Sequence, residues 1–162
     1  MKTLLLLRHA KSSWDEPGLP DHDRPLSKRG LKNARRMGAV LRENELAPGL
    51  IISSTAKRAR LTAEIVAEES GYDVEIRFTP DFYGADAEAF FEHVRQTPAD
   101  VQSVMVVGHN PDLEEFLTAL TGETETLPTA ALAQVELPIG RWSELGSDIA
   151  GKLLKIWKPR EL

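Results

Sequence analysis

Short apolar runs alternate with helix-like segments along most of this chain, and this alternation restricts its fold more than any other feature. Each run has the length of a β-strand and contains few polar residues, which is typical of strands that are covered on both faces. Between the runs, apolar residues recur at a spacing of three and four, as on the buried side of a helix. The predicted strands are Leu4–Leu7, Leu50–Ser53, Val74–Phe78, Ser103–Val107, Ala131–Leu137 and Leu153–Trp157. The pattern predicts a three-layer αβα sandwich with a largely parallel central sheet.

The segments between the strands carry helix-start signals. The predicted helices begin at Ser27, at Ser54 or Thr55, at Asp86 and at Pro111. The serine, threonine and aspartate side chains can accept hydrogen bonds from a first helical turn, and proline suits that turn. With 162 residues and neither an internal repeat nor a linker, the chain is expected to form one domain over 1–162.

Composition and charge exclude several classes of partner. The chain is 41% hydrophobic, which indicates a globular protein, and its net charge of -5 provides no field for a nucleic-acid backbone or an anionic membrane. No cysteine is present, so disulfides and thiolate chemistry are excluded. The leading apolar run ends at Arg8 and His9 without a cleavage pattern, and no run is long enough to span a bilayer. We therefore expect a soluble, cytoplasmic protein.

Two arginines and two histidines follow predicted strands. Arg8 and His9 come directly after the first strand, Arg58 lies beyond the second, and His109 follows the fourth. In an open α/β sheet, ligands bind beyond the carboxyl ends of the strands. These four side chains are therefore expected to share one crevice.

Such a crevice is suited to a phosphate group. Guanidinium groups match phosphate oxygens and stay charged at working pH. A neutral imidazole can attack phosphorus and form a phosphohistidine intermediate, and from the residues alone either His9 or His109 could be this nucleophile. The arginines would stabilise the charge of the transition state. The scheme requires neither a metal ion nor another cofactor.

Four ordered motifs resemble those of the histidine phosphatase superfamily, which includes the phosphoglycerate mutases. They are Arg8-His9-Ala10-Lys11-Ser12, Asp23-Arg24-Pro25-Leu26-Ser27 with Gly30, Ser53–Ala59 with Thr62-Ala63, and Gly108-His109-Asn110-Pro111. The resemblance covers nearly the whole chain and implies a phosphoglycerate mutase-like fold. It further implies that His9 is the nucleophile, that Arg8 and Arg58 clamp the phosphate, and that His109 donates a hydrogen bond. Ser12 would be a secondary ligand.

Within that superfamily, the sequence most resembles the SixA-type phosphohistidine phosphatases. The shared features are the compact length, R-H-A-K-S in place of R-H-G, and Leu127–Ala131. This resemblance implies action on phosphohistidine in proteins. The superfamily's mutases and phosphomonoesterases usually place a glutamate after the third strand to protonate the leaving group, but Thr79–Gly84 contains none. Asp81 is the nearest acid there and is predicted to contact substrate. When Tyr83-Gly84 is aligned with the matching pair of the larger enzymes, however, Pro80 takes the position of their acid.

Three functional hypotheses remain open from the sequence. The first is a phosphatase in signal transduction that removes phosphate from a phosphotransfer domain or a carrier protein. The second is a small-molecule phosphomonoesterase or mutase that acts on a phosphate ester. The third is a phosphate-binding adaptor without turnover, which the intact His9 argues against.

Some further residues have a functional and a structural interpretation. Asp21-His22-Asp23 could bind a metal ion, but a solvated loop is the favoured interpretation. The basic residues of the first helix, Lys28, Arg29, Lys32, Arg35 and Arg36, could bind an acidic partner, but a solvated helix face is favoured. Trp14 is expected to pack in the protein rather than to recognise a ligand.

Overall fold

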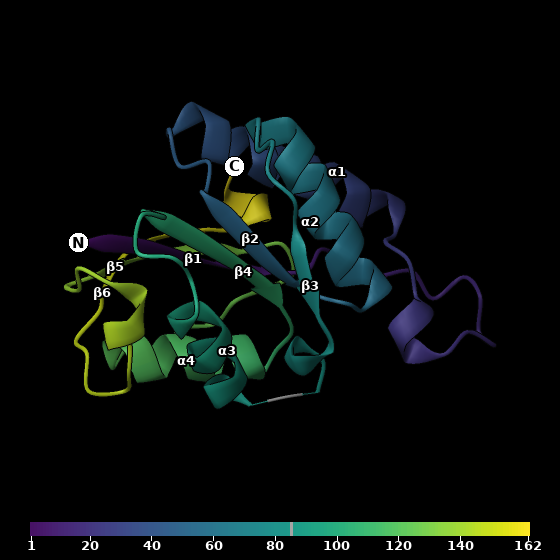
Figure 1. Ribbon diagram of the computed structural model, residues 1–162. Coiled ribbons are helices and arrows are strands. Elements are labelled where there is room, and N and C mark those ends of the chain that lie inside the picture. Colours follow the sequence, from purple (N-terminus) through teal and green to yellow (C-terminus); the bar gives the residue numbers. More distant parts are fainter. Residues whose placement is uncertain (85) are drawn as a thin grey trace.

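A six-stranded sheet lies between two pairs of helices in the computed structural model, which describes residues 1–84 and 86–162 (Figure 1). The strands are β1 (Lys2–Arg8), β2 (Leu50–Ser54), β3 (Arg77–Thr79), β4 (Ser103–Gly108), β5 (Leu132–Leu137) and β6 (Lys152–Trp157). Their order across the sheet is β3-β2-β4-β1-β5-β6. The strands β1 to β4 are parallel, whereas β5 and β6 are antiparallel to their neighbours. The predicted, largely parallel sheet is confirmed.

The helices form the two outer layers. Figure 1 shows α1 (Lys28–Glu43) and α2 (Lys57–Ser70) on one face of the sheet, with α3 (Ala87–Arg95) and α4 (Asp112–Thr121) on the other. Four 3₁₀ turns among the described residues complete the connections: η1 (Asp21–Asp23), η2 (Pro80–Phe82), η3 (Trp142–Glu144) and η4 (Pro159–Glu161). None of the helices within 1–84 and 86–162 combines the length and hydropathy that a membrane-spanning segment needs.

The central strands explain why their sequences are apolar without interruption. Leu4 and Leu6 of β1 pack into the core beneath α3 and α4, whereas Leu5 and Leu7 pack into the core beneath α1 and α2. All four side chains are fully buried. Successive residues of a strand point to opposite faces, so a strand covered on both sides needs an apolar residue at every position.

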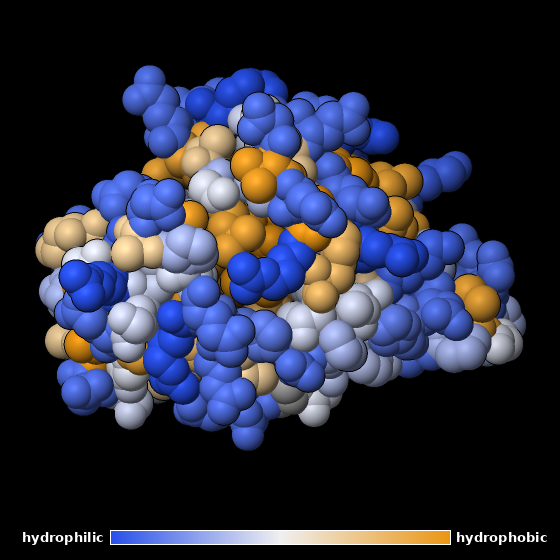
Figure 2. Space-filling view, in the orientation of Figure 1, coloured by the Kyte–Doolittle hydropathy of each residue, from blue (hydrophilic) through white to orange (hydrophobic). Residues whose placement is uncertain are grey.

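The third strand is shorter and begins later than predicted. The sequence predicts Val74–Phe78, but β3 contains Arg77–Thr79 and pairs with only the last three residues of β2. It forms the edge of the sheet, where Val74 is 54% exposed. Apolar side chains reach the surface beside this edge (Figure 2). The alternation of apolar residues therefore extends beyond the part of the segment that finds a hydrogen-bonding neighbour.

The start of α2 also differs from the prediction. Neither Ser54 nor Thr55 is the N-cap; Ala56 occupies that position and makes no side-chain capping bond. The Ser54 hydroxyl instead accepts a hydrogen bond from the Ala56 amide (3.2 Å) and lies 2.9 Å from His109 Nε2. By contrast, Ser27 caps α1 as predicted, because its hydroxyl accepts the Gly30 amide hydrogen bond at 3.0 Å.

Candidate active site

The four predicted site residues meet at the carboxyl ends of the parallel strands. Arg8, His9, Arg58 and His109 line one cleft of about 290 Å³. The imidazole rings of the two histidines are 5.0 Å apart between centroids. The remaining lining residues are Lys11, Ser12, Trp14, Arg24, Asn110 and Thr129.

His9 is held as a neutral imidazole with one nitrogen available. Its Nδ1 lies 2.7 Å from the Ala10 carbonyl oxygen, which can only accept, so Nδ1 carries the proton and Nε2 keeps its lone pair. The pKa of His9 is lowered to about 4. Burial is the main cause, and the charges of Arg58 and Arg8 add to it, whereas the Ala10 hydrogen bond acts in the opposite direction. At neutral pH, His9 therefore has the protonation state of a nucleophile.

Neighbouring elements fix the backbone on both sides of His9. Its amide donates to the Gly108 carbonyl of β4 at 3.1 Å, and the Ala10 amide donates to Thr62 Oγ1 of α2 at 3.0 Å. Gly30 of α1 lies so close to this turn that a Cβ atom there would be 2.1 Å from the Lys11 carbonyl oxygen. The motif residues Thr62 and Gly30 thus position His9 without lining the cleft.

His109 follows β4 and has one imidazole nitrogen without a partner. Its Nε2 lies 2.9 Å from Ser54 Oγ, whereas its buried Nδ1 has no hydrogen bond to any described residue. Burial, together with the charge of the neighbouring His9, lowers the pKa of His109 to about 3. His109 is therefore a neutral imidazole at working pH, and it lines the cleft beside His9.

One nitrogen of the Arg8 guanidinium also lacks a hydrogen-bond partner within residues 1–84 and 86–162. Its Nη1 donates to the Leu127 carbonyl at 3.0 Å, and its buried Nε has no hydrogen-bond partner among the described residues. No carboxylate forms an ion pair with Arg8 in the described part of the chain. Arg8 lines the cleft, and a guanidinium that is not paired with a carboxylate fits a phosphate oxygen there.

The Leu127–Ala131 stretch is tied to this arginine and to His9. The Ala130 amide lies 3.1 Å from the carbonyl oxygens of both Arg8 and His9, and Ala130 adopts a φ of 64°, which is uncommon for a residue other than glycine. Glu114 accepts the Leu127 amide hydrogen bond at 2.7 Å and an Asn110 Nδ2 hydrogen bond at 2.9 Å. This stretch therefore supports the strand end that carries Arg8 and His9.

Arg58 is already bound to a carboxylate from the loop between β1 and α1. Its Nη1 donates to the Asp21 carbonyl at 2.8 Å and its Nη2 to Asp21 Oδ2 at 2.9 Å. Arg24 donates to Asp21 Oδ1 at 3.1 Å, and the Tyr83 hydroxyl donates to Oδ2 at 2.7 Å. The Tyr83 hydrogen bond, followed by Arg58, lowers the pKa of Asp21 to about 2, so this carboxylate is ionised at any working pH.

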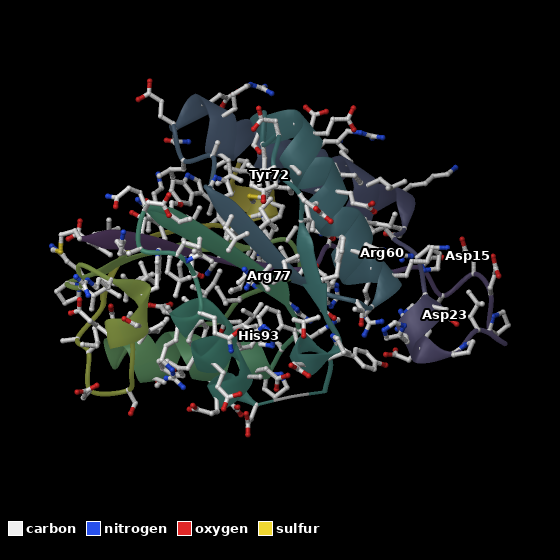
Figure 3. The ribbon with its side chains drawn as sticks, viewed as in Figure 1. Asp15, Asp23, Arg60, Tyr72, Arg77 and His93 are labelled. Carbon is white, nitrogen blue, oxygen red and sulfur yellow. The ribbon has the colours of Figure 1, made fainter. Side chains whose placement is uncertain are left out.

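This arrangement replaces the metal interpretation of Asp21-His22-Asp23. Asp21 faces the two arginines, whereas His22 Nε2 lies 3.1 Å from Thr55 Oγ1. Asp15 and Asp23 lie on the projecting loop (Figure 3), and both are exposed. No group of three potential metal ligands occurs within 1–84 and 86–162.

The structure adds Arg24 and Trp14 to the site, and neither was predicted there. The Arg24 guanidinium lies 3.2 Å from the Trp14 ring centroid and donates to Ser12 Oγ at 2.5 Å. Trp14 is 73% exposed, so the expectation that it packs in the protein is wrong. Arg24 belongs to the motif Asp23-Arg24-Pro25-Leu26, and its place in this motif could have indicated that it lies at the site. Ser12 lies in the cleft, as the resemblance implies.

The structure does not bring Asp81 into the cleft. Its carboxylate Oδ2 lies 2.7 Å from Nε2 of His93, a residue of α3 that is labelled in Figure 3. Asp81 is exposed and lines neither this cleft nor the adjoining one. The prediction that Asp81 contacts substrate therefore gains no support from its position.

A second cleft, of about 410 Å³, adjoins the first and contains a different acid. The two clefts share Arg58, His109 and Asn110, and the second also contains Asp112. Asp112 is 8% exposed, and burial, followed by the charges of Glu115 and Asp86, raises its pKa. The sequence analysis missed this residue, since an acidic residue in a first helical turn is common without a catalytic role.

The chain is similar to known proteins along its whole length. Residues 4–86 match the model of the histidine phosphatase superfamily, branch 1. An uncharacterised chloroplastic protein from Arabidopsis thaliana is 37% identical, over 88% of this chain and 70% of the relative. A solved structure from Agrobacterium tumefaciens, provisionally named as the phosphohistidine phosphatase SixA, is 30% identical with a TM-score of 0.83 and covers 98% of both chains. The protein histidine phosphatase SixA complexed with tungstate, at 22% identity, has the same fold, with a TM-score of 0.84 over 98% of both chains.

Proposed function

Because the chain belongs to the histidine phosphatase superfamily, we propose that it removes phosphate from phosphohistidine in proteins, through a phosphorylated form of His9. The observation that carries this proposal is the state of His9. It is a buried, neutral imidazole with Nδ1 bonded to Ala10 and Nε2 free, in a cleft that also contains Arg8, at the end of β1, and Arg58, in the first turn of α2. This is the geometry of an activated nucleophile for phosphorus.

In the first step, His9 Nε2 attacks phosphorus. The leaving imidazole ring first takes a proton from solvent, and the new N–P bond then forms as the bond from phosphorus to the substrate nitrogen breaks, which releases a neutral imidazole. Arg8 and Arg58 bind the phosphoryl oxygens and stabilise the charge that spreads over them. In the second step, water attacks the phosphorus of phosphorylated His9, which releases inorganic phosphate and restores the imidazole.

The absence of an acid beside His9 supports phosphohistidine as the substrate class. No aspartate or glutamate is among the described residues that line the cleft holding His9. A phosphoramidate can be protonated at its leaving nitrogen before the bond breaks, whereas an alkoxide leaving group depends on a positioned acid. The likeness to the Agrobacterium structure, at 30% identity, supports the same choice.

The surroundings of the cleft support a protein substrate. Trp14 lies at the rim with most of its ring in solvent, and exposed tryptophan and arginine side chains are common at protein interfaces. The partner we propose is a phosphotransfer domain or a phosphorylated carrier protein, and the site of action we propose is the cytoplasm.

Asp112 favours a second candidate, a phosphomonoesterase that acts on a small phosphate ester. Its carboxyl group lies in the adjoining cleft, and its raised pKa would help it to protonate an alkoxide. If this role is real, Asp112→Asn will reduce ester hydrolysis at least about a hundredfold. The same substitution will then change phosphohistidine hydrolysis much less.

The experiment compares a phosphohistidine-bearing protein with a panel of phosphate monoesters. We expect rapid hydrolysis of the first, slow hydrolysis of the second, and an acid-labile phosphoenzyme that is absent from His9→Ala. Efficient hydrolysis of one ester, reduced by Asp112→Asn, would replace the proposal with the phosphomonoesterase. Phosphate binding without any turnover or phosphoenzyme would leave only a binding adaptor.

A further inference from the structure

A small third cavity adjoins the cleft on its α1 side. It has a volume of about 170 Å³ and is lined by Arg29, Asn33, Pro128, Thr129, Pro159 and Arg160. Thr129 also lines the cleft that contains His9, so the two spaces meet at this residue. A substrate that reaches from His9 past Thr129 would therefore come to the third cavity.

The charged residues that line this cavity are both arginines. Arg29 lies on α1, and Arg160 comes from η4, which packs against the same helix. Neither arginine forms an ion pair or a side-chain hydrogen bond with any described residue, and no aspartate or glutamate is among the residues that line the cavity. Other arginines of this acidic chain, such as Arg42 and Arg95, are paired with carboxylates.

An amide side chain is part of the same cavity wall. Asn33 follows Arg29 by one helical turn, so both lie on one side of α1. Only 9% of the residue is exposed, but its amide is not among the buried polar atoms that lack a partner, so it can reach a ligand in the cavity that it lines. Its NH₂ group is a donor that an anion can use.

Acidic side chains gather on the opposite side of the cleft. The adjoining cleft near α4 contains Asp112, and the surface beyond its Pro111 continues with Glu114, Glu115 and Glu125, whereas the charge of Asp21 is balanced by Arg24 and Arg58. The cleft that contains His9 therefore lies between an acidic surface near α4 and the basic cavity near α1. Such an arrangement orients a partner that carries a matching pattern of charge.

We propose that Arg29, Asn33 and Arg160 bind a second anionic group of the substrate, a carboxylate or a phosphate, while its phosphoryl group lies at His9. The inference rests on the proposed function and narrows its substrate. In a protein substrate, this group is an acidic side chain near the phosphorylated histidine. Guanidinium groups and the NH₂ of an amide donate hydrogen bonds and do not accept them. The three side chains therefore favour an anion over a cation or an apolar group.

The test uses two phosphohistidine peptides that differ only in the flanking residues, glutamate in one and glutamine in the other. For the wild type, we expect KM to be about tenfold lower for the glutamate peptide, which corresponds to about 1.4 kcal/mol. Arg29→Ala/Arg160→Ala should remove this preference by raising KM for the glutamate peptide alone. The preference should also weaken as salt is added, because both arginines are exposed.

The matched control is Lys32→Ala/Arg35→Ala, which removes the same charge from exposed positions of α1 outside the cavity. This control variant should keep the preference for the glutamate peptide. If both double variants lost the preference equally, net charge alone would explain it and the proposal would be overturned. Hydrolysis of both peptides with equal KM would also overturn it while leaving the proposed function intact. Failure to hydrolyse either peptide would contradict the proposed function itself.

A third arm distinguishes the source of the anion. A bisphosphate ester and its monophosphate counterpart are compared in the same variants. Dependence on Arg29 and Arg160 for the bisphosphate, with none for the glutamate peptide, would support the cavity as an anion site but assign it to a metabolite. Dependence for the peptide would assign it to an acidic protein segment.

Discussion

The two walls of the active cleft are built in different ways. The inner wall consists of Arg8, His9 and His109, which stand at the ends of β1 and β4 over two fully buried cores. The outer wall comes from the loop of residues 12–26, whose Asp21 and Arg24 are held by ion pairs between side chains. The arginine of the inner wall, Arg8, has no ion pair with any described residue, whereas the arginine of the outer wall, Arg24, is paired with Asp21. Strong transition-state contacts are therefore expected from the inner wall and adjustable ones from the outer wall.

The largest expected effect is a difference in kcat/KM between two variants, each of which loses one arginine from a different wall. Arg8→Ala should lower kcat/KM on a phosphohistidine protein about a thousandfold, because it removes a preorganised donor and its charge from a partly buried site. Arg24→Ala should lower it only about tenfold, since Arg24 also donates to Ser13, Asp21 and Ser12. Steady-state kinetics give both values, and thermal melts check that both variants fold. Equal losses would show that the walls do not differ in this way.

The pH dependence of stability provides the next separation. His9 is neutral in the folded protein with a pKa of about 4, below its ordinary value of about 6.5, so the unfolded state binds more protons between these values. The stability that this group provides is complete above about pH 6.5 and declines as the pH falls to about 4, by on the order of 2 to 3 kcal/mol. Urea unfolding between pH 7 and 4 measures the decline, and His9→Asn should reduce it.

The outer wall should respond to acid later. Asp21 has a pKa of about 2, below its ordinary value of 3.8, so its stabilising contribution is present above about pH 3.8 and is lost only as the pH falls toward 2. Consequently, Asp21→Asn should leave the slope between pH 7 and 4 unchanged. A changed slope in this variant would contradict the assignment of the slope to the inner wall.

A smaller effect concerns the competition between Asp21 and the phosphoryl group. Asp21 uses two N–H groups of Arg58 and adds negative charge beside the cleft, so Asp21→Asn should tighten inhibition by tungstate or inorganic phosphate about threefold. The control is Asp23→Asn, which removes the same charge from the same loop where no arginine is bound. Weaker inhibition in Asp21→Asn would mean that Asp21 mainly positions Arg58 for the ligand.

The smallest expected effect is at the rim. Trp14→Ala removes the exposed ring on which Arg24 lies, and it should raise KM for a phosphohistidine protein about threefold. Trp14→Phe should restore most of the loss. If KM for a small phosphoramidate rises by the same factor, Trp14 acts by holding Arg24 rather than by contacting the protein partner.

The sequence predicted the inner wall better than the outer wall, for a physical reason. Leu4–Leu7 and Ser103–Val107 are strands by local pattern, and the carboxyl ends of parallel strands must meet at one edge of the sheet. Arg8, His9 and His109 could therefore be placed together before any contact was known. The edge strand β3 was predicted less accurately, because pairing at a sheet edge depends on where the neighbouring strand ends.

The outer wall and the flanking cavities depend on contacts between distant parts of the chain. Asp21 reaches Arg58 across 37 positions and Tyr83 across 62, and Arg160 joins Arg29 only because η4 packs on α1. Loop side chains have no periodicity, so their partners are decided by packing rather than by local pattern. The sequence by itself thus determined the layers, the strand ends, and which histidines and arginines gather at them. Only the tertiary structure decided that Asp21 binds Arg58, that Asp81 faces His93, and that the cleft lies between an acidic surface near α4 and a basic cavity near α1.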